Sequence, residues 1–149
     1  MAANVVIRPI GEDEREAWNP LWAGYLTFYK ASIPAEISDL AWFRFHDPDE
    51  PMFALGAYAE GKLSGFAHYQ FHRSTWAPKR YCYLEDLFVA DNVRGLGFGR
   101  ALIEEVYRKA QAADASRVYW VTQSNNARAR ALYDKVADNV GFIQYRKVF

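Results

Sequence analysis

The chain has 149 residues and no net charge, because 18 basic residues balance 18 acidic ones, and its isoelectric point lies near 6.8. Hydrophobic residues make up 51% of the chain and aromatic residues 17%. This length and composition can bury a sizeable core, so we expect one domain spanning residues 1–149. The even charge balance argues against bulk nucleic-acid binding and against a polybasic membrane anchor.

Cysteine use and the first residues bear on the compartment. Cys82 is the single cysteine, which excludes an internal disulfide and fits a reducing environment. The first segment, Met1 to Pro9, lacks the long apolar region of a signal peptide. No apolar run approaches the length of a membrane span. We therefore expect a cytoplasmic protein.

The first half of the chain predicts a strand, two helices and a loop. Residues 4–9 are rich in β-branched side chains and predict a strand. Pro20 either begins a helix capped by Asn19 or lies inside one helix that starts near Asp13; we favour the single, kinked helix. A second helix is predicted over residues 35–46. The first helix is supported by aromatic and apolar residues at helical spacing: Trp18, Leu21, Trp22, Tyr25 and Tyr29.

The second half predicts an antiparallel meander followed by a crossover. Strands are expected at residues 52–59, 63–72 and 81–89, joined by short loops. A helix to about residue 113 then leads to a strand at Val118–Val121, which must pair in parallel with the strand at 81–89. A last helix near 126–137 and a strand over 141–149 complete an α/β fold. It is a mixed, mostly antiparallel sheet of six to seven strands with helices on both faces and a central parallel pair.

The stretch from Arg94 to Arg100 places three glycines between a strand and a helix. Its spacing fits neither the Rossmann fingerprint nor the Walker loop. It fits [Q/R]-x-x-G-x-[G/A], with Arg94, Gly97 and Gly99 in the defined positions. Glycines let the backbone approach a phosphate, and the helix start supplies N–H donors. A plain tight turn is the alternative reading of this segment alone.

A second motif follows downstream. The segment Asn126 to Tyr133 fits N-x-x-A-x-x-[LF]-Y, with Asn126, Ala129 and Tyr133 in the defined positions. Together the two motifs resemble the GNAT N-acetyltransferases. The resemblance implies that acetyl-coenzyme A is the co-substrate. Independently of it, both motifs follow the carboxyl ends of neighbouring parallel strands, so we expect them to converge on one crevice. No histidine, cysteine or aspartate cluster has metal-ligand spacing, so no metal is expected. The implied cofactor-binding residues are Leu87, Phe88, Val89, Arg94, Gly95, Leu96, Gly97, Phe98, Gly99, Arg100, Asn126 and Ala129.

Two residues are the catalytic candidates. An amine arrives protonated at neutral pH, so a base must accept its proton, and Glu85 stands in an otherwise apolar strand. Strand alternation puts Glu85 and Asp86 on opposite faces, unless a bulge changes their directions. His68 and His72 are weaker candidates for the base, each more simply a core or surface histidine. The resemblance implies that Tyr133 is the acid that protonates the leaving thiolate; a plain core tyrosine is the alternative.

The acceptor is expected to be a small primary amine. The string from Tyr83 to Val89 resembles diamine and polyamine acetyltransferases, and residues 118–120 with the Asn126 motif resemble the histone and polyamine branch. Protein acetylation and non-catalytic acyl-coenzyme A binding are the alternative functions. Acidic and aromatic side chains suit a cationic acceptor: Tyr25, Tyr29, Trp76 and Asp86.

The chain departs from the family pattern in one place. Seven residues, 134–140, separate Tyr133 from Gly141 and Phe142, a longer path than the family usually has. The register of the final strand therefore stays open, together with any acceptor pocket or dimer contact that it forms. A homodimer is the assembly to be tested.

Overall fold

The computed structural model describes residues 4–149. The prediction that Met1 to Pro9 is no signal peptide falls partly on residues 1–3, which lie outside the described residues. The chain divides into two compact units, one ending at Tyr119 and the other spanning Trp120–Phe149, and we describe each by itself. Among the described residues, no helix is long and apolar enough to cross a membrane.

The first unit is built on one sheet. Its strands neighbour one another in chain order: β1 (Val5–Pro9), β2 (Met52–Ala59), β3 (Lys62–His72), β4 (Tyr81–Val89) and β5 (Arg117–Tyr119). The first four strands pair antiparallel, and β4 and β5 pair in parallel over Tyr81–Tyr83, as the crossover predicted. The mixed sheet with a parallel pair is thereby confirmed.

The predicted strand number is wrong. Within residues 4–149 the sheet has five strands instead of six to seven, and residues 137–149 form no strand. This segment has the apolar residues of a strand, but its large side chains are exposed, among them Phe142 and Tyr145. Strand propensity records how well side chains pack on a sheet, so a strand needs a neighbouring edge as well as a suitable sequence.

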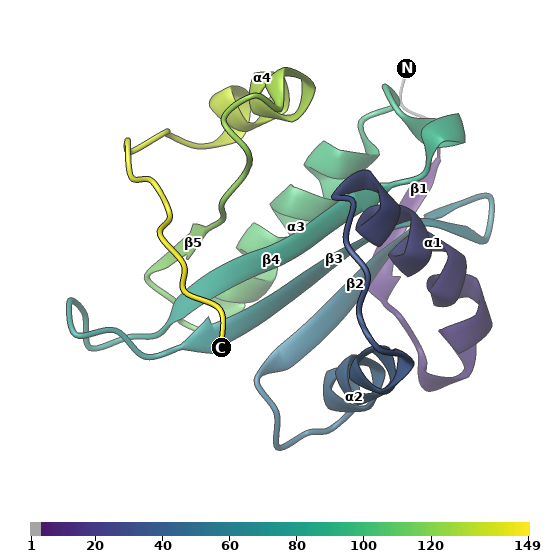
Figure 1. Cartoon of the computed structure of the whole chain (residues 1–149), viewed down its shortest axis with the longest axis horizontal. Coiled ribbons are helices and arrows are strands. Elements are labelled where there is room, and N and C mark those ends of the chain that lie inside the picture. The colour runs from purple at the N-terminus through teal and green to yellow at the C-terminus, as the bar shows by residue number, and fades with distance from the viewer. Residues whose placement is uncertain (1–3) are drawn as a thin grey trace. The chain divides into compact units, whose positions relative to one another are not determined.

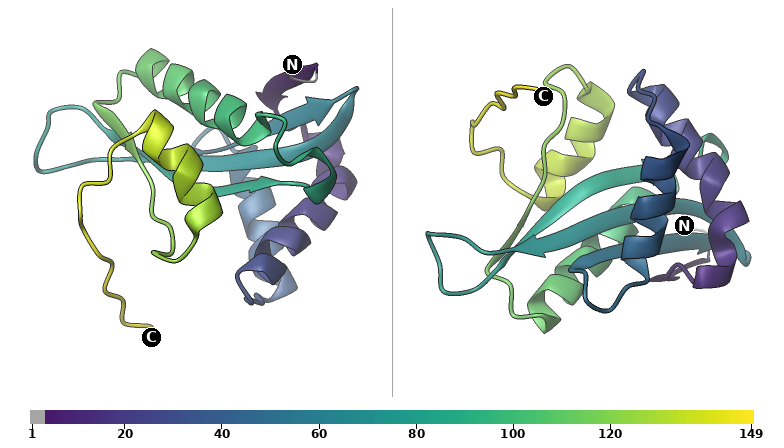
Figure 2. Two further views of the ribbon diagram at one scale, coloured as in Figure 1. Left: turned by 90° about the horizontal axis from the view of Figure 1, so that it is seen from above. Right: turned by 60° about the horizontal axis from the view of Figure 1, so that its bottom comes forward.

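Helices cover both faces of the sheet, as predicted (Figures 1 and 2). A short 3-10 turn, η1 (Glu12–Glu14), leads into α1 (Arg15–Phe28), a single helix with Pro20 inside it. This helix and α2 (Ala35–Phe45) lie on one face, and α3 (Phe98–Ala112) lies on the other. A second 3-10 turn, η2 (Asp91–Val93), precedes the glycine segment, and the second unit contains α4 (Ala127–Val136).

The core on the α1 face is aromatic. Trp18 is fully buried and packs in one cluster with Phe66 of β3. The ring of Trp22 stacks against Trp18 with centroids 5.6 Å apart, and the ring of Tyr25 stacks against Trp22 at 5.3 Å. This row of rings fixes the position of α1 over β3 and β4, because each ring buries a large apolar area.

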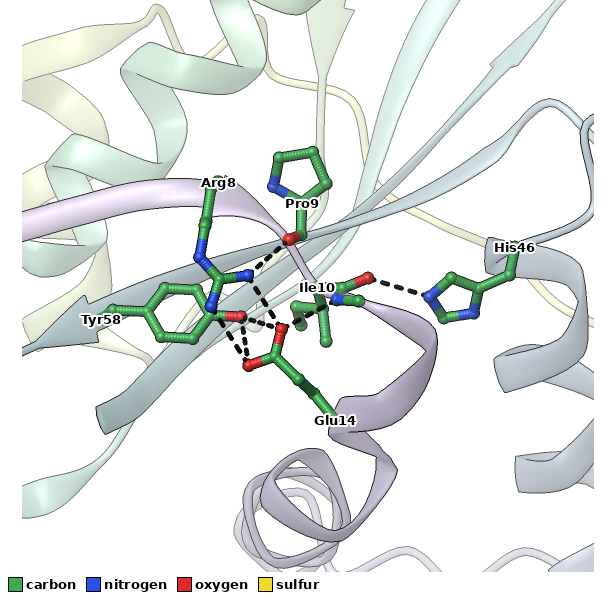
Figure 3. Close-up of polar contacts among 7 residues, drawn as sticks. Arg8, Pro9, Ile10, Glu14, His46 and Tyr58 are labelled. Atoms are coloured by element: carbon green, nitrogen blue, oxygen red, sulfur yellow. Dashed lines mark hydrogen bonds and ion pairs between the residues drawn. The ribbon is translucent and has the colours of Figure 1, made fainter. Parts of the chain in front are cut away.

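A partly exposed polar junction ties the start of α1 to the sheet (Figure 3). The Tyr58 hydroxyl donates to Glu14, with distances of 2.9 and 3.0 Å to its two carboxylate oxygens. Arg8 pairs with Glu14 at 2.8 Å and lies over the Tyr58 ring, and the Gly11 N–H donates to the same carboxylate at 2.9 Å. These contacts, led by the Arg8 hydrogen bond, lower the pKa of Glu14.

We predict that Glu14→Gln lowers the free energy of unfolding by about 1–3 kcal/mol, because it removes charge-assisted hydrogen bonds at the junction. Since the folded state lowers the pKa of Glu14, its contribution is complete above the carboxyl's ordinary pKa and disappears as pH falls through the folded-state pKa. Urea unfolding at pH 7 and at pH 3 measures both effects. The control is Glu12→Gln in the same turn; equal losses in the two variants would contradict the role of Glu14.

Candidate active site

Strand β4 contains a bulge at its two neighbouring carboxylates. His68 pairs with Asp86 and Tyr69 pairs with Leu84, so the register between β3 and β4 passes over Glu85. Glu85 contacts Gln70 and Asp86 contacts His68, and these two partners lie two residues apart on β3. Because residues two apart on a strand share a face, both carboxylates lie on the α1 face. Regular alternation, which would place the two on opposite faces, is wrong here, because β4 has the bulge that was the alternative.

Asp86 is held by a buried chain of hydrogen bonds. The Nε1–H of Trp18 donates to Nε2 of His68 at 3.1 Å. Nδ1 of the same imidazole lies 2.9 Å from Oδ2 of Asp86. An indole nitrogen only donates, so Nε2 must accept and the ring proton sits on Nδ1, which donates to the carboxylate. The His68 ring is 4% exposed, and only 15% of the Asp86 side chain is accessible.

Glu85 is the more accessible carboxylate of the pair. Its Oε1 accepts a hydrogen bond of 2.6 Å from the Gln70 amide. The pKa of Glu85 is raised above its ordinary value, first by desolvation and then by the negative charge of Asp86, whereas the Gln70 bond opposes the shift. A carboxylate whose pKa is raised towards neutrality is suited to accept a proton from an amine.

Two tyrosines of α1 complete the surroundings of Asp86. Burial raises the pKa of Tyr25, and the charge of Asp86 and a hydrogen bond with that carboxylate raise it further. The pKa of Tyr29 is raised by burial and by the charge of Asp86. The two tyrosine rings contact each other with centroids 5.0 Å apart, and Tyr25 also packs against Phe88 at 6.3 Å. The structure therefore brings Tyr25, Tyr29 and Asp86 together beside Phe88, and their role in binding an acceptor stays a prediction.

The last residues of β4 present backbone groups for a ligand. The Ala90 N–H donates to the Ser64 carbonyl of β3 at 2.8 Å. Successive amides of a strand point in opposite directions, so the N–H of Val89 points away from β3. On that side, among the described residues, β4 pairs with β5 over Tyr81–Tyr83, which is the other end of β4 from Val89. The N–H of Val89 therefore points to the side of β4 away from β3, where it could donate a hydrogen bond to a ligand carbonyl.

The glycine segment has the backbone conformation expected of a phosphate-binding loop. Gly95 and Gly97 have φ of +80° and +85°, and Gly97 is the left-handed N-cap of α3. A Cβ on either glycine would meet no heavy atom within 4 Å, so their faces open to space. The first N–H groups of a helix have no acceptor within the helix, and they carry the positive end of its dipole. Phe98 is buried beneath this turn and anchors it.

Arg94 connects the loop to the end of β4. Its Nε donates to the Val89 carbonyl at 3.2 Å and pairs with Asp91 at 3.1 Å. Its guanidinium lies 6.0 Å from the Phe28 ring centroid and 5.8 Å from that of Phe88. Arg94 therefore holds the loop against the strand, and its charge stands beside the loop where the resemblance placed it. Arg100 pairs with Glu104 on the exposed side of α3.

The second motif lies in the second unit. Asn126 is the N-cap residue of α4, and its side-chain amide lies 3.5 Å from the Thr122 hydroxyl. The Tyr133 ring packs edge-on against Trp120 with centroids 5.4 Å apart. Ala129 lies in the first turns of the same helix. The roles predicted for these three residues, and the convergence of the two motifs, stay predictions.

Three other residues are now placed. Trp76 is 79% exposed in the loop between β3 and β4, at the end of the sheet away from α1, where it lies near Arg117. The structure does not bring Trp76 together with Asp86.

His72 is exposed, and the Tyr119 hydroxyl lies 2.6 Å from its Nε2. Trp18, which positions His68, was missed as a site residue because a buried tryptophan at helical spacing indicates only a core position.

The described residues contain no group of three or more histidine, cysteine, aspartate or glutamate side chains arranged to hold a metal ion. The site itself brings together carboxylates, neutral hydrogen-bond donors and backbone N–H groups. Such a set fits proton transfer from an amine next to a phosphate-bearing ligand.

The model of the acetyltransferase (GNAT) family matches residues 12–137, and the chain belongs to this family. The D-amino-acid N-acetyltransferase HPA3 of Saccharomyces cerevisiae is 37% identical over 145 residues, covering 96% of this chain and 90% of that protein. The L-ornithine N5-acetyltransferase NATA1 of Arabidopsis thaliana is 25% identical over 125 residues, covering 84% of this chain and 50% of that protein.

Solved structures agree on the fold. The structure of AAC(6')-Iy in complex with a bisubstrate analogue of coenzyme A and acetylneamine has a TM-score of 0.83 at 19% identity, covering 99% of this chain and all of that one. A ribosomal-protein-alanine N-acetyltransferase from Brucella melitensis biovar Abortus 2308 has a TM-score of 0.80 at 23% identity, covering 98% and 99% of the two chains. The protein is an acetyl-coenzyme A-dependent N-acetyltransferase. The comparisons support its family and not the polyamine branch in particular.

We predict that Gly97→Val weakens acetyl-coenzyme A binding by at least about tenfold, because a side chain at this position fills the space in front of the helix start. Gly61→Val is the matched control. Gly61 lies in the β2–β3 turn with φ of +79° and equally open space, so valine there carries a similar backbone strain outside the glycine segment. Calorimetric titration measures both affinities; equal losses would remove the phosphate role of Gly97.

Proposed function

We propose that this enzyme acetylates a small primary amine by direct attack on acetyl-coenzyme A. The observation that carries the proposal is the pair of carboxylates that the bulge places on one face beside Tyr25 and Tyr29. Two negative charges near aromatic rings favour a cationic acceptor. The relatives named for activity on a D-amino acid and on ornithine support a small amine without choosing between an amino acid and a diamine or polyamine.

Each residue has a role in this proposal. Glu85 takes a proton from the ammonium group, directly or through a water, and the free amine then attacks the acetyl carbon. The Val89 N–H stabilises the oxygen that becomes negative as the carbon–nitrogen bond forms. The carbon–sulfur bond then breaks, and Tyr133 gives a proton to the leaving thiolate. Asp86 holds the charged acceptor near the base.

The glycine loop and the β4 edge form the proposed co-substrate site. The N–H groups from Leu96 to Arg100 bind the pyrophosphate, with Arg94 beside them. The pantetheine arm extends along the Leu87–Val89 edge, where the strand offers backbone groups. Asn126 and Ala129 contribute from the second motif. A homodimer and a cytoplasmic location stay predictions.

A panel of acceptors tests the proposed function. Thiol release from acetyl-coenzyme A is measured with D- and L-amino acids, ornithine, putrescine, spermidine, an aminoglycoside and a lysine peptide. We expect one class of small amine to give a kcat/KM at least about tenfold above that of the peptide, since a small pocket discriminates by shape and charge. Preference for the peptide would favour protein acetylation, and binding of acetyl-coenzyme A without thiol release would favour a non-catalytic module.

We predict that Glu85→Gln lowers kcat/KM by about 10²–10⁴-fold and removes the acidic limb of its pH profile, because the base is active only when ionised. The raised pKa of Glu85 places that limb above the ordinary range of a glutamate. Gln70→Leu is the matched variant: it removes the bond that lowers this pKa, so the limb should move to higher pH. An unchanged profile in Glu85→Gln would exclude Glu85 as the base.

A further inference from the structure

We propose that Trp18 and His68 are positioning residues that keep a full negative charge on Asp86 for the cationic acceptor. Trp18 does so by occupying Nε2 of His68, the nitrogen that must take up a proton before the imidazole can neutralise its carboxylate partner. This inference rests on the proposed function, in which Asp86 holds the acceptor. It is carried by the hydrogen-bond chain from Trp18 through His68 to Asp86.

The first step is the protonation state of the imidazole. An imidazolium carries a proton on both nitrogens, and a proton on Nε2 would point at the Nε1–H of Trp18, 3.1 Å away. Trp18 is completely buried and His68 is 4% exposed, so neither ring can turn to water to relieve this conflict. The rings of Phe45 and Phe66 lie 4.5 and 4.2 Å from the imidazole and hold it in place.

The second step is the charge that remains. The neutral imidazole donates one hydrogen bond to Asp86 but adds no positive charge. The contact between His68 and Asp86 is therefore one between a neutral hydrogen-bond donor and a charged carboxylate, and not an ion pair. Such a carboxylate is stabilised in the protein and still attracts a cation.

The other titratable groups around the pair do not supply that cation. Tyr25 and Tyr29 of α1 face Asp86, and their raised pKa values keep both hydroxyls protonated and neutral. Glu85 of β4 is negative when it acts as a base, and Tyr119 of β5 responds to the Glu85 charge with a raised pKa. Arg15 of α1 lies over the Trp18 ring at 5.5 Å, and its charge is matched by Asp39 of α2 at 2.7 Å.

The test is Trp18→Phe, which keeps a ring in the core and removes the N–H that occupies Nε2. Nε2 of His68 then has no donor facing it, so the imidazole can be protonated in acid and form an ion pair with Asp86. We expect about a tenfold rise in acceptor KM there, the size expected from cancelling one charge next to a bound cation near the surface. At pH 8 the KM should stay near that of the wild type.

Trp22→Phe is the matched control. Trp22 belongs to the same aromatic cluster and packs 5.3 Å from His68, but its N–H donates to the Ser38 hydroxyl and not to the imidazole. It loses a partly buried indole of the same cluster while the chain to Asp86 stays intact, so its KM should not rise in acid. Matching pH dependence of KM in Trp18→Phe and Trp22→Phe would overturn the proposal.

A double variant guards against a general packing effect. His68→Asn provides an amide N–H for Asp86 and carries no charge at any pH, so alone it should keep the wild-type dependence of KM on pH. Combined with Trp18→Phe, it should remove the rise in acid, because no ring remains to be protonated. A rise that persists in the double variant would show that packing loss, and not charge, is responsible.

Nitrogen-15 NMR of the imidazole separates this inference from the proposed function. In the wild type the His68 ring, assigned by its loss in His68→Asn, should show the Nδ1–H tautomer, whereas Trp18→Phe should show the imidazolium in acid. This readout needs no acceptor. An imidazolium in the wild type at pH 6 would overturn the inference, and an inactive acceptor panel with a persistent tautomer would overturn the function alone.

Discussion

The extra residue in β4 is the constraint on which the site depends. A regular strand would send Glu85 and Asp86 to opposite faces, and one of the two would lie against α3. The register shift beside His68 turns both towards α1. Glu85 is then exposed, while Asp86 is largely enclosed by His68 and Tyr25, so a local change of backbone geometry gives two neighbouring carboxylates different surroundings.

The buried carboxylate is tolerated because neutral groups satisfy it. His68 donates through Nδ1, and Tyr25 approaches from α1. Removing a carboxylate from water is costly unless its oxygens accept hydrogen bonds, and these donors meet that need without cancelling the charge. The same arrangement raises the pKa of Glu85, so the stability of the core and the chemistry of the site use one set of contacts.

The two halves of the reaction use different parts of the chain. In the proposed function, binding of the co-substrate depends mainly on the backbone, namely positive-φ glycines, a helix start and a strand edge. These features survive wide sequence change, and structures only 19 and 23% identical keep the fold with TM-scores of 0.83 and 0.80. In the proposed function, side chains such as Asp86, Tyr25 and Tyr29 select the acceptor, and such side chains can change while a family keeps its fold.

The sequence by itself determined the elements, the parallel strand pair, the glycine loop and the identity of Glu85 and Asp86, because periodicity and short motifs are local properties. Tertiary structure decided which way the two carboxylates face, since a bulge depends on the register of the partner strand. It also left residues 137–149 without a strand, because a strand forms only where an edge accepts it. The contact between Trp18 and His68, fifty residues apart, followed from the packing of α1 on β3, which no local pattern records.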